Sequence, residues 1–128
     1  MVNYVTDPGR ITDLSTGIAS NHIDPVQLVE AYLDRITHVE PTIKAWCHLD
    51  VSSALEQAEV RRFELRRGYI RGSLHGIPVA IKDIIDVAGL PTRAYSPTRA
   101  NTQPAQSDAH VVQSLRDAGA IIMGKVHT

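Results

Sequence analysis

One lysine stands where an apolar segment ends. Lys82 directly follows the run 77–81, Ile-Pro-Val-Ala-Ile, which is too short for a helix and favours a buried strand. Ligands bind at the C-terminal edge of such strands in open α/β sheets. An amine that loses its water there can become a neutral general base, so we expect Lys82 to be buried. The structural alternative is an ion pair with Asp83 or Asp86, or a side chain that reaches solvent.

A second lysine follows a glycine pattern that resembles a phosphate-binding loop. Residues 119–125 have the glycine and lysine spacing of a P-loop. The residue after the lysine is Val126, which offers no hydroxyl to magnesium, and the intervening residues favour a strand. We therefore predict a strand here and no nucleotide site.

The remaining reactive side chains give no metal or thiol pattern. The six histidines, at positions 22, 38, 48, 75, 110 and 127, lack paired metal-ligand spacing, and one cysteine cannot seed a zinc site. His48 could serve Cys47 as a base, but adjacent strand residues point to opposite faces. We expect Cys47 to be buried and unreactive, and no metal to be bound.

Composition limits the classes of protein. The 128 residues are 43% apolar and 21% charged with a net charge of −1, which favours one globular domain over a disordered chain. No apolar run is long enough to cross a membrane, and no overall basic field favours nucleic acid. The first ten residues lack a secretory pattern, so a cytoplasmic protein is expected. The arginines at 61, 62, 66 and 67 are better explained by a helix C-terminus than by a nucleic-acid patch.

Helices are predicted for the first half. Ile11–Ser20 forms a short helix, and Asp24-Pro25 begins a second that Pro41 stops. A strand is expected around Ala45-Trp46-Cys47. A third helix, Val51–Arg67 with Asp50 as its N-cap, has a thin apolar stripe and should lie on the surface.

The second half has the pattern of a parallel βαβ unit. The strand at 78–82 is followed by a polar loop, a helix at 108–118 capped by Ser107, and a strand at 120–124. Apolar strands on either side of a helix indicate a parallel pair with both faces covered. The fold class is therefore α/β.

The same half resembles the amidase signature family. The resemblance rests on LHGIPVAIKDIIDVAGLPTRA at 74–94, GKVHT at 124–128, and spaced positions between them (Pro104, Asp108, Ala109, Val112, Leu115, Ala118, Gly119 and Ala120). It covers about Leu74 to Thr128, and the helix before Ala45-Trp46 is also similar. Tyr95-Ser96 stands where the family commonly has Gly-Ser.

The resemblance implies a role for Lys82. In that family the corresponding lysine belongs to a Ser–cis-Ser–Lys triad, which hydrolyses a carboxamide C–N bond through an acyl-enzyme without a metal or organic cofactor. Asp83 and Asp86 are candidates for residues that support the lysine without contacting the substrate. The implied partner is a small-molecule amide, with no nucleic acid and no membrane; a homo-oligomer is left open.

The resemblance also implies an N-terminal portion of an α/β/α amidase domain with a mixed central sheet. We expect a helical region at about 10–70 and the unit with the lysine motif at about 74–128. The Gly/Ser-rich stretch that supplies both serines should lie downstream of Thr128, so the isolated chain is expected to be inactive. The alternative, from another class, is a non-catalytic truncated relic or an interaction module.

Overall fold

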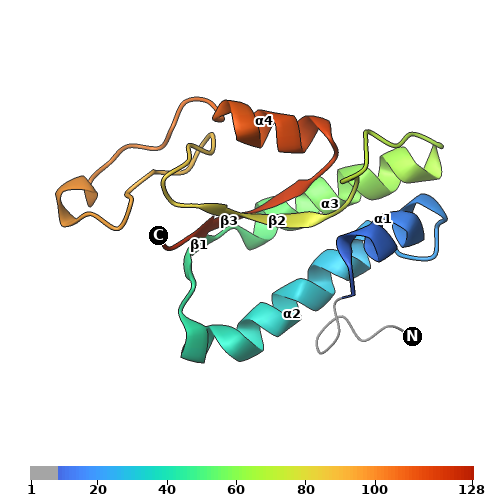
Figure 1. Ribbon diagram of the computed structural model, residues 1–128, viewed down its shortest axis with the longest axis horizontal. Helices are drawn as coiled ribbons and strands as arrows, with labels where there is room; N and C mark the ends of the chain where they lie inside the picture. Colours follow the sequence, from blue (N-terminus) through green and yellow to red (C-terminus); the bar gives the residue numbers. More distant parts are fainter. Residues whose placement is uncertain (1–8) are drawn as a thin grey trace.

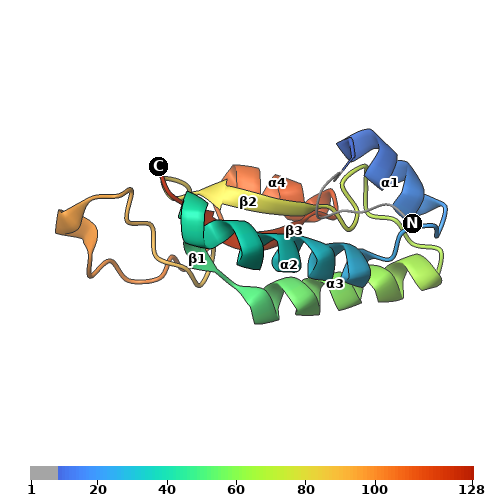
Figure 2. The same ribbon diagram turned by 90° about the horizontal axis from the view of Figure 1, so that it is seen from below.

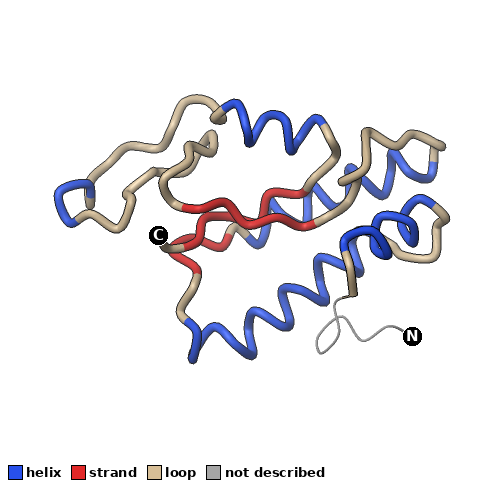
Figure 3. The backbone as a smooth tube through the Cα atoms, viewed as in Figure 1, coloured by secondary structure: helices blue, strands red, loops and turns tan. Residues whose placement is uncertain are grey.

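The computed structural model describes residues 9–128, which form a mixed α/β structure. The N-terminal segment in which a secretory pattern was sought lies largely outside these residues, at 1–8. Figure 1 and Figure 3 show the elements in chain order. They are α1 (Ile11–Ala19), α2 (Pro25–Ile43), β1 (Trp46–Leu49), α3 (Val51–Arg66), β2 (Pro78–Lys82), the 3-10 turn η1 (Pro97–Arg99), α4 (His110–Asp117) and β3 (Ile121–Val126).

Helix α2 begins as predicted but does not stop where predicted. The Asp24 carboxylate accepts hydrogen bonds from the Val26 and Gln27 amides, and Pro25 occupies the first turn. The helix continues through Pro41 to Ile43, so the prediction that Pro41 ends it was wrong. A proline removes one i→i−4 hydrogen bond and its ring crowds the carbonyl four residues earlier, and here the helix continues only two residues beyond it.

Helix α3 lies on the surface, as its thin apolar stripe predicted, and it is buried along one side only. Ala54 and Ala58 are fully buried against α2 and β3, in a cluster that includes Val29 and Ile121. Small side chains let the helix approach its neighbours closely, so a thin stripe is buried rather than exposed. The predicted N-cap is confirmed, since the Asp50 carboxylate accepts from the Ser53 amide.

In the described residues the strands form one mixed sheet in the order β1-β3-β2. β2 and β3 are parallel neighbours, which confirms the predicted pair, and β1 runs antiparallel to β3. Helix α4 covers one face of the sheet, and α2 and α3 lie on the other (Figures 1 and 2). The predicted α/β class is therefore confirmed.

Helix α4 begins later than predicted. It starts at His110, and the residue before it, Ala109, makes no side-chain cap, so the prediction of a helix from Asp108 capped by Ser107 was wrong. The Asp108 carboxylate instead accepts from the Ala88 amide and from the Arg116 guanidinium, both at 2.8 Å. Asp108 thereby joins the loop after β2 to the end of α4.

The central strand β3 carries a bulge that changes which face its later side chains occupy. Val79 pairs with Ile122 but Ala80 pairs with Gly124, so Met123 has no partner in β2. Side chains alternate along a strand, and one extra residue reverses the alternation. Lys125 consequently pairs with Ile81, whose side chain packs in the layer of α4.

A side chain from α3 stabilises the backbone just before this bulge. The Gln57 amide donates to the Ile122 carbonyl at 3.0 Å, and its oxygen accepts from the Ile122 N–H at 2.9 Å. The N–H and the carbonyl of Ile122 therefore both have hydrogen-bond partners, although the short edge strand β1 does not extend as far as Ile122.

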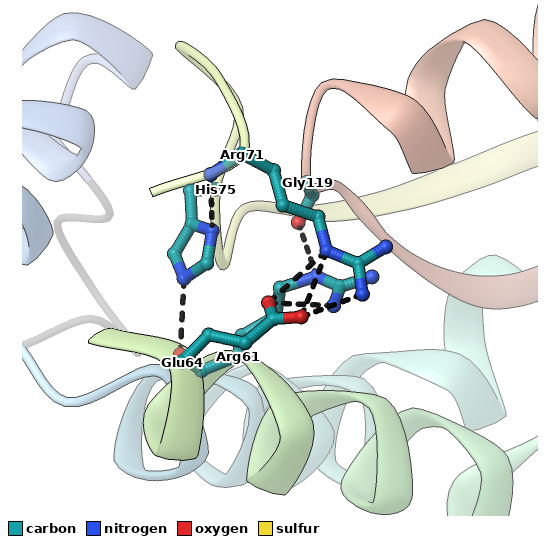
Figure 4. Close-up of polar contacts among 5 residues, drawn as sticks. All are labelled: Arg61, Glu64, Arg71, His75 and Gly119. Atoms are coloured by element: carbon teal, nitrogen blue, oxygen red, sulfur yellow. Dashed lines mark hydrogen bonds and ion pairs between the residues drawn. The ribbon is translucent and has the colours of Figure 1, made fainter. Parts of the chain in front are cut away.

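At the other end of the sheet, a polar network joins α3 to the chain that enters β2 (Figure 4). The buried Arg61 donates to the Gly119 carbonyl and to the Glu64 carboxylate, and Arg71 also pairs with Glu64. His75 is 3% exposed; its Nδ1 accepts from the Arg71 amide and its Nε2 lies 3.0 Å from the Arg61 carbonyl. Two hydrogen bonds of this kind require a neutral ring with the proton on Nε2.

The network predicts a loss of stability in mild acid. Burial lowers the pKa of His75, while Arg61 and Arg71 oppose a positive ring and Glu64 favours one. The unfolded chain therefore binds a proton first, and the free energy of unfolding should fall as pH drops below about 6.5, by at most about 1.4 kcal/mol per pH unit. Urea denaturation between pH 7.5 and 5.0 measures this slope.

The control separates His75 from the other histidines. A His75→Asn variant should have a flatter profile over this range, whereas a variant of the exposed His110, His110→Gln, should keep the wild-type slope. Equal slopes for wild type and His75→Asn would contradict the assignment. The range stops above the region in which carboxylates titrate.

None of the helices in residues 9–128 is both long enough and apolar enough to cross a bilayer.

Candidate active site

Lys82 is the last residue of β2, as predicted, but its side chain is exposed. The expectation that it would be buried was wrong for the described residues. Alternation along β2 places Ile81 under α4 and puts Lys82 on the opposite face with Ala80. Helices α2 and α3 cover that face farther back, and no polar partner of the Lys82 ammonium lies within residues 9–128.

An apolar groove runs along the same face toward Lys82. It has a volume of about 230 Å³ and lies between the C-terminal half of α2 and the sheet. Tyr32 and Ile36 line it from α2, and Trp46, Ala80 and Met123 line it from the three strands. Lys82 follows Ala80 on this face, so its side chain emerges where the groove reaches the carboxyl end of β2.

The residue after Lys82 lies on the other face, in a buried ion pair. The Lys125 ammonium donates to the Asp83 carboxylate at 2.8 Å, and the two side chains are 1% and 7% exposed. An ion pair between Lys82 and Asp83 was one alternative from the sequence, but in the structure Asp83 pairs with Lys125. Burial alone would raise the pKa of Asp83; the hydrogen bond and charge of Lys125 outweigh it and hold that pKa below its usual value.

Asp86 connects to the same pair through one hydroxyl. The Thr92 hydroxyl donates to the Asp86 carboxylate at 2.6 Å and lies 3.2 Å from the Lys125 ammonium. Both acidic residues singled out from the sequence therefore belong to one network behind β2. That network does not contact the Lys82 side chain.

An open cleft of about 640 Å³ adjoins this network. Cys47, His48, Asp83, Arg93 and Lys125 line it together with the loop at 100–104. The thiol of Cys47 donates to the Lys125 carbonyl at 3.3 Å, and Cys47 is exposed, so the prediction that it is buried was wrong. Partial burial and the nearby Asp83 charge raise the pKa of the thiol, which disfavours the nucleophilic thiolate.

The loop at 92–107 shows a further departure at Tyr95. Ala94 and Tyr95 have φ of 52° and 54°, in the left-handed region that favours glycine. Tyr95 stands where the resembling family commonly has glycine, and its exposed ring meets His127 edge-on at 5.5 Å. The backbone shape that a glycine would adopt here is therefore kept despite the tyrosine.

Lys125 was not singled out as a site residue, because its segment was interpreted as a strand and as part of the GKVHT match. The strand predicted at 120–124 is confirmed as β3 (Ile121–Val126). The signal that could have found the pair is a lysine inside a segment expected to be a buried strand, because a buried ammonium requires an acidic or polar partner. Among residues 9–128, no cluster of three or more His, Cys, Asp and Glu side chains is arranged to hold a metal.

Comparison with known proteins shows the family of this chain. The Amidase family profile matches residues 27–128, which include most of α2, the sheet and the complete lysine motif. The chain belongs to the amidase family. The resemblance of the lysine motif to the amidase signature family is thereby confirmed.

Individual amidase-family proteins agree over most of this chain. It is 36% identical over 118 residues to an amidase of Pseudomonas putida, and 39% identical to a subunit of the glutamyl-tRNA(Gln) amidotransferase of Chloroflexus aurantiacus. The crystal structure of the peptide amidase of Stenotrophomonas maltophilia superposes with a TM-score of 0.82 at 38% identity. These matches cover 92%, 91% and 91% of this chain but only 25%, 24% and 24% of the relatives, so the chain spans about a quarter of their length.

Proposed function

We propose that residues 1–128 form the N-terminal part of a single amidase domain that hydrolyses a carboxamide C–N bond, with Lys82 as its base. The observation that carries this proposal is the place of the G-I-P-V-A-I-K-D motif. Its lysine ends β2 at the carboxyl edge of a parallel strand pair, inside the segment that matches the Amidase family. This edge is where α/β sheets bind their ligands.

The proposed chemistry needs Lys82 as a neutral amine. The amine takes a proton from a cis-serine, which takes the proton of the nucleophilic serine as that oxygen attacks the carbonyl carbon. The C–N bond breaks, the nitrogen leaves as ammonia or an amine with a proton returned through the same relay, and water then releases the acid. Backbone N–H groups would stabilise the oxyanion.

Neither serine can be assigned within residues 1–128 by its motif. The exposure of Lys82 on an open face supports this division of the site, because that side of the strand has room for groups from another segment. We therefore propose that the 128-residue chain by itself has no turnover. Asp83 and Asp86 are proposed to support the backbone at Lys82 rather than to touch the substrate.

The substrate class follows from the family. We propose a small-molecule carboxamide, bound without a metal or organic cofactor, by a cytoplasmic protein that binds neither nucleic acid nor membrane. Arg61 and Arg62, which had suggested a basic patch, are paired with Glu64 and with Glu59 and Asp24. Their charges are thus used within the molecule, which supports the exclusion of nucleic acid.

Ammonia release from a panel of carboxamides tests the proposal. The complete product of the gene that encodes these residues should hydrolyse at least one aryl, alkyl or peptide amide, and the 128-residue chain should match buffer. Turnover by the 128-residue chain would reveal a nucleophile within it and contradict the assignment of the serines. Absence of turnover by the complete product on every amide would favour the non-catalytic alternative.

A further inference from the structure

Lys125, the most deeply buried charged residue in the described part of the chain, lies behind Lys82 on the opposite face of the sheet, and it is paired there with Asp83. As whole residues Lys125 and Asp83 are 1% and 5% exposed; Lys125 lies near the end of β3, and Asp83 directly follows β2. A buried ion pair contributes little net stability compared with apolar side chains of similar size, because burying each charge is costly. Packing alone therefore gives no reason for this pair.

The pair holds together three segments at the point where Lys82 leaves the sheet. Lys125 donates to the Asp83 carboxylate, to the Pro91 carbonyl at 3.3 Å and to the Thr92 hydroxyl. The other Asp83 oxygen accepts from the Arg93 amide at 3.3 Å. One ammonium and one carboxylate thus fix the returning loop at 91–93 against the end of β2.

The backbone of Asp83 is fixed on both sides as well. Its N–H donates to the Val126 carbonyl at 2.8 Å, and its carbonyl accepts from the Ala94 amide at 2.9 Å. Asp83 directly follows β2, and its N–H continues the hydrogen bonding with β3 by one residue. Successive side chains in such a ladder point to opposite faces, so holding Asp83 on one face sets the direction of Lys82 on the other. The bulge at Met123 is what brings Lys125 to the face of Asp83.

We propose that Lys125 is a positioning residue, which orients Lys82 by holding Asp83 and the loop behind it. This inference rests on the proposed function, in which Lys82 is the base. The Lys125 ammonium does not touch the substrate; it acts through the carboxylate and the backbone of Asp83.

The first test uses the 128-residue chain. It separates the effect of the ion pair on the local backbone from the general cost of leaving one buried charge without its partner. Asp83→Leu and Lys125→Met alone each leave a buried charge unpaired and should destabilise the fold strongly, whereas the double variant should recover most of the global stability. Hydrogen exchange then reports on the two ends of the sheet. In the double variant, protection of the amides at 83 and 94 should fall at least tenfold relative to that of Ile121, whose N–H bonds the Ile77 carbonyl at the far end.

The second test measures hydrolysis by the complete gene product. The double variant should lose at least tenfold in kcat with KM within twofold, because the base is misdirected while, in this proposal, neither substituted side chain touches the substrate. The control is Glu64→Gln with Arg71→Met, which removes an ion pair at the amino end of β2. That variant should lose stability but keep kcat and the ratio of protection factors.

The outcomes separate this inference from the proposed function. Unchanged relative protection in the stable double variant would overturn the positioning role, as would a parental kcat in that variant when Lys82→Met is inactive. If Lys82→Met is as active as the parent, the proposed function fails, and the exchange ratio still decides whether Lys125 fixes the backbone at Lys82.

Discussion

Replacing Lys82 by methionine should reduce kcat of the complete gene product by about a thousandfold or more, the scale seen when one member of a catalytic triad is removed. Methionine keeps the length of the side chain but cannot take a proton. Because Lys82 is exposed and has no polar partner among residues 9–128, the free energy of unfolding should change by less than about 0.5 kcal/mol. Steady-state kinetics and urea denaturation on the same preparations measure both quantities.

Two further variants make this test specific. Lys82→Arg supplies a positive charge, but its guanidinium is always protonated and cannot accept a proton. This variant should therefore be as inactive as the methionine variant. Arg66→Met removes an exposed cation from the end of α3 and should keep parental kcat. A Lys82→Arg variant with substantial activity would mean that Lys82 contributes a charge rather than a base.

Replacing Gly124 by alanine should destabilise the 128-residue chain by about 3 kcal/mol or more, through steric overlap and backbone strain together. Gly124 has φ of +143°, and a Cβ atom there would overlap the carbonyl oxygen of His48 in β1. The Leu49 Cα lies only 3.1 Å from the same point. Both obstacles are backbone atoms of the paired strand, so the pairing of β1 with β3 must open. Urea denaturation measures the loss.

Gly68→Ala is the matched control for the backbone component. Gly68 has φ of +77°, but nothing lies within 4 Å of its added Cβ. This variant should lose only about 1 kcal/mol from the unfavourable backbone conformation. Similar losses in the two variants would mean that β1 moves aside at Gly124, and that the close approach of the strands is not required.

Much of the architecture follows from local sequence signals. The Asp24-Pro25 start of α2, the Asp50 cap of α3 and the parallel pair around α4 all rest on short-range chemistry, and each was confirmed. The ends of helices were less predictable. Helix α2 continues two residues past Pro41, and Asp108 bonds to Ala88 and Arg116, which no local pattern reveals.

The candidate site was predicted in position but not in environment. The motif located Lys82 at the end of β2, yet its exposure depends on which layer covers that face, which is a property of the assembled sheet. Likewise, the partnership of Asp83 with Lys125 depends on a bulge at Met123. A bulge is set by packing and by groups such as Gln57, so a sequence pattern of period two does not show it.

The strand order has a consequence for synthesis on the ribosome. β3 lies between β1 and β2, so within residues 9–128 neither earlier strand has a strand neighbour until Ile121–Val126 has been made. At typical translation rates, β1 waits roughly 4–15 s for this partner. During that interval the nascent chain can form α2 and α3 but no sheet. Its two unpaired strands are then the segments that could pair with other chains, and a chaperone would have to cover them.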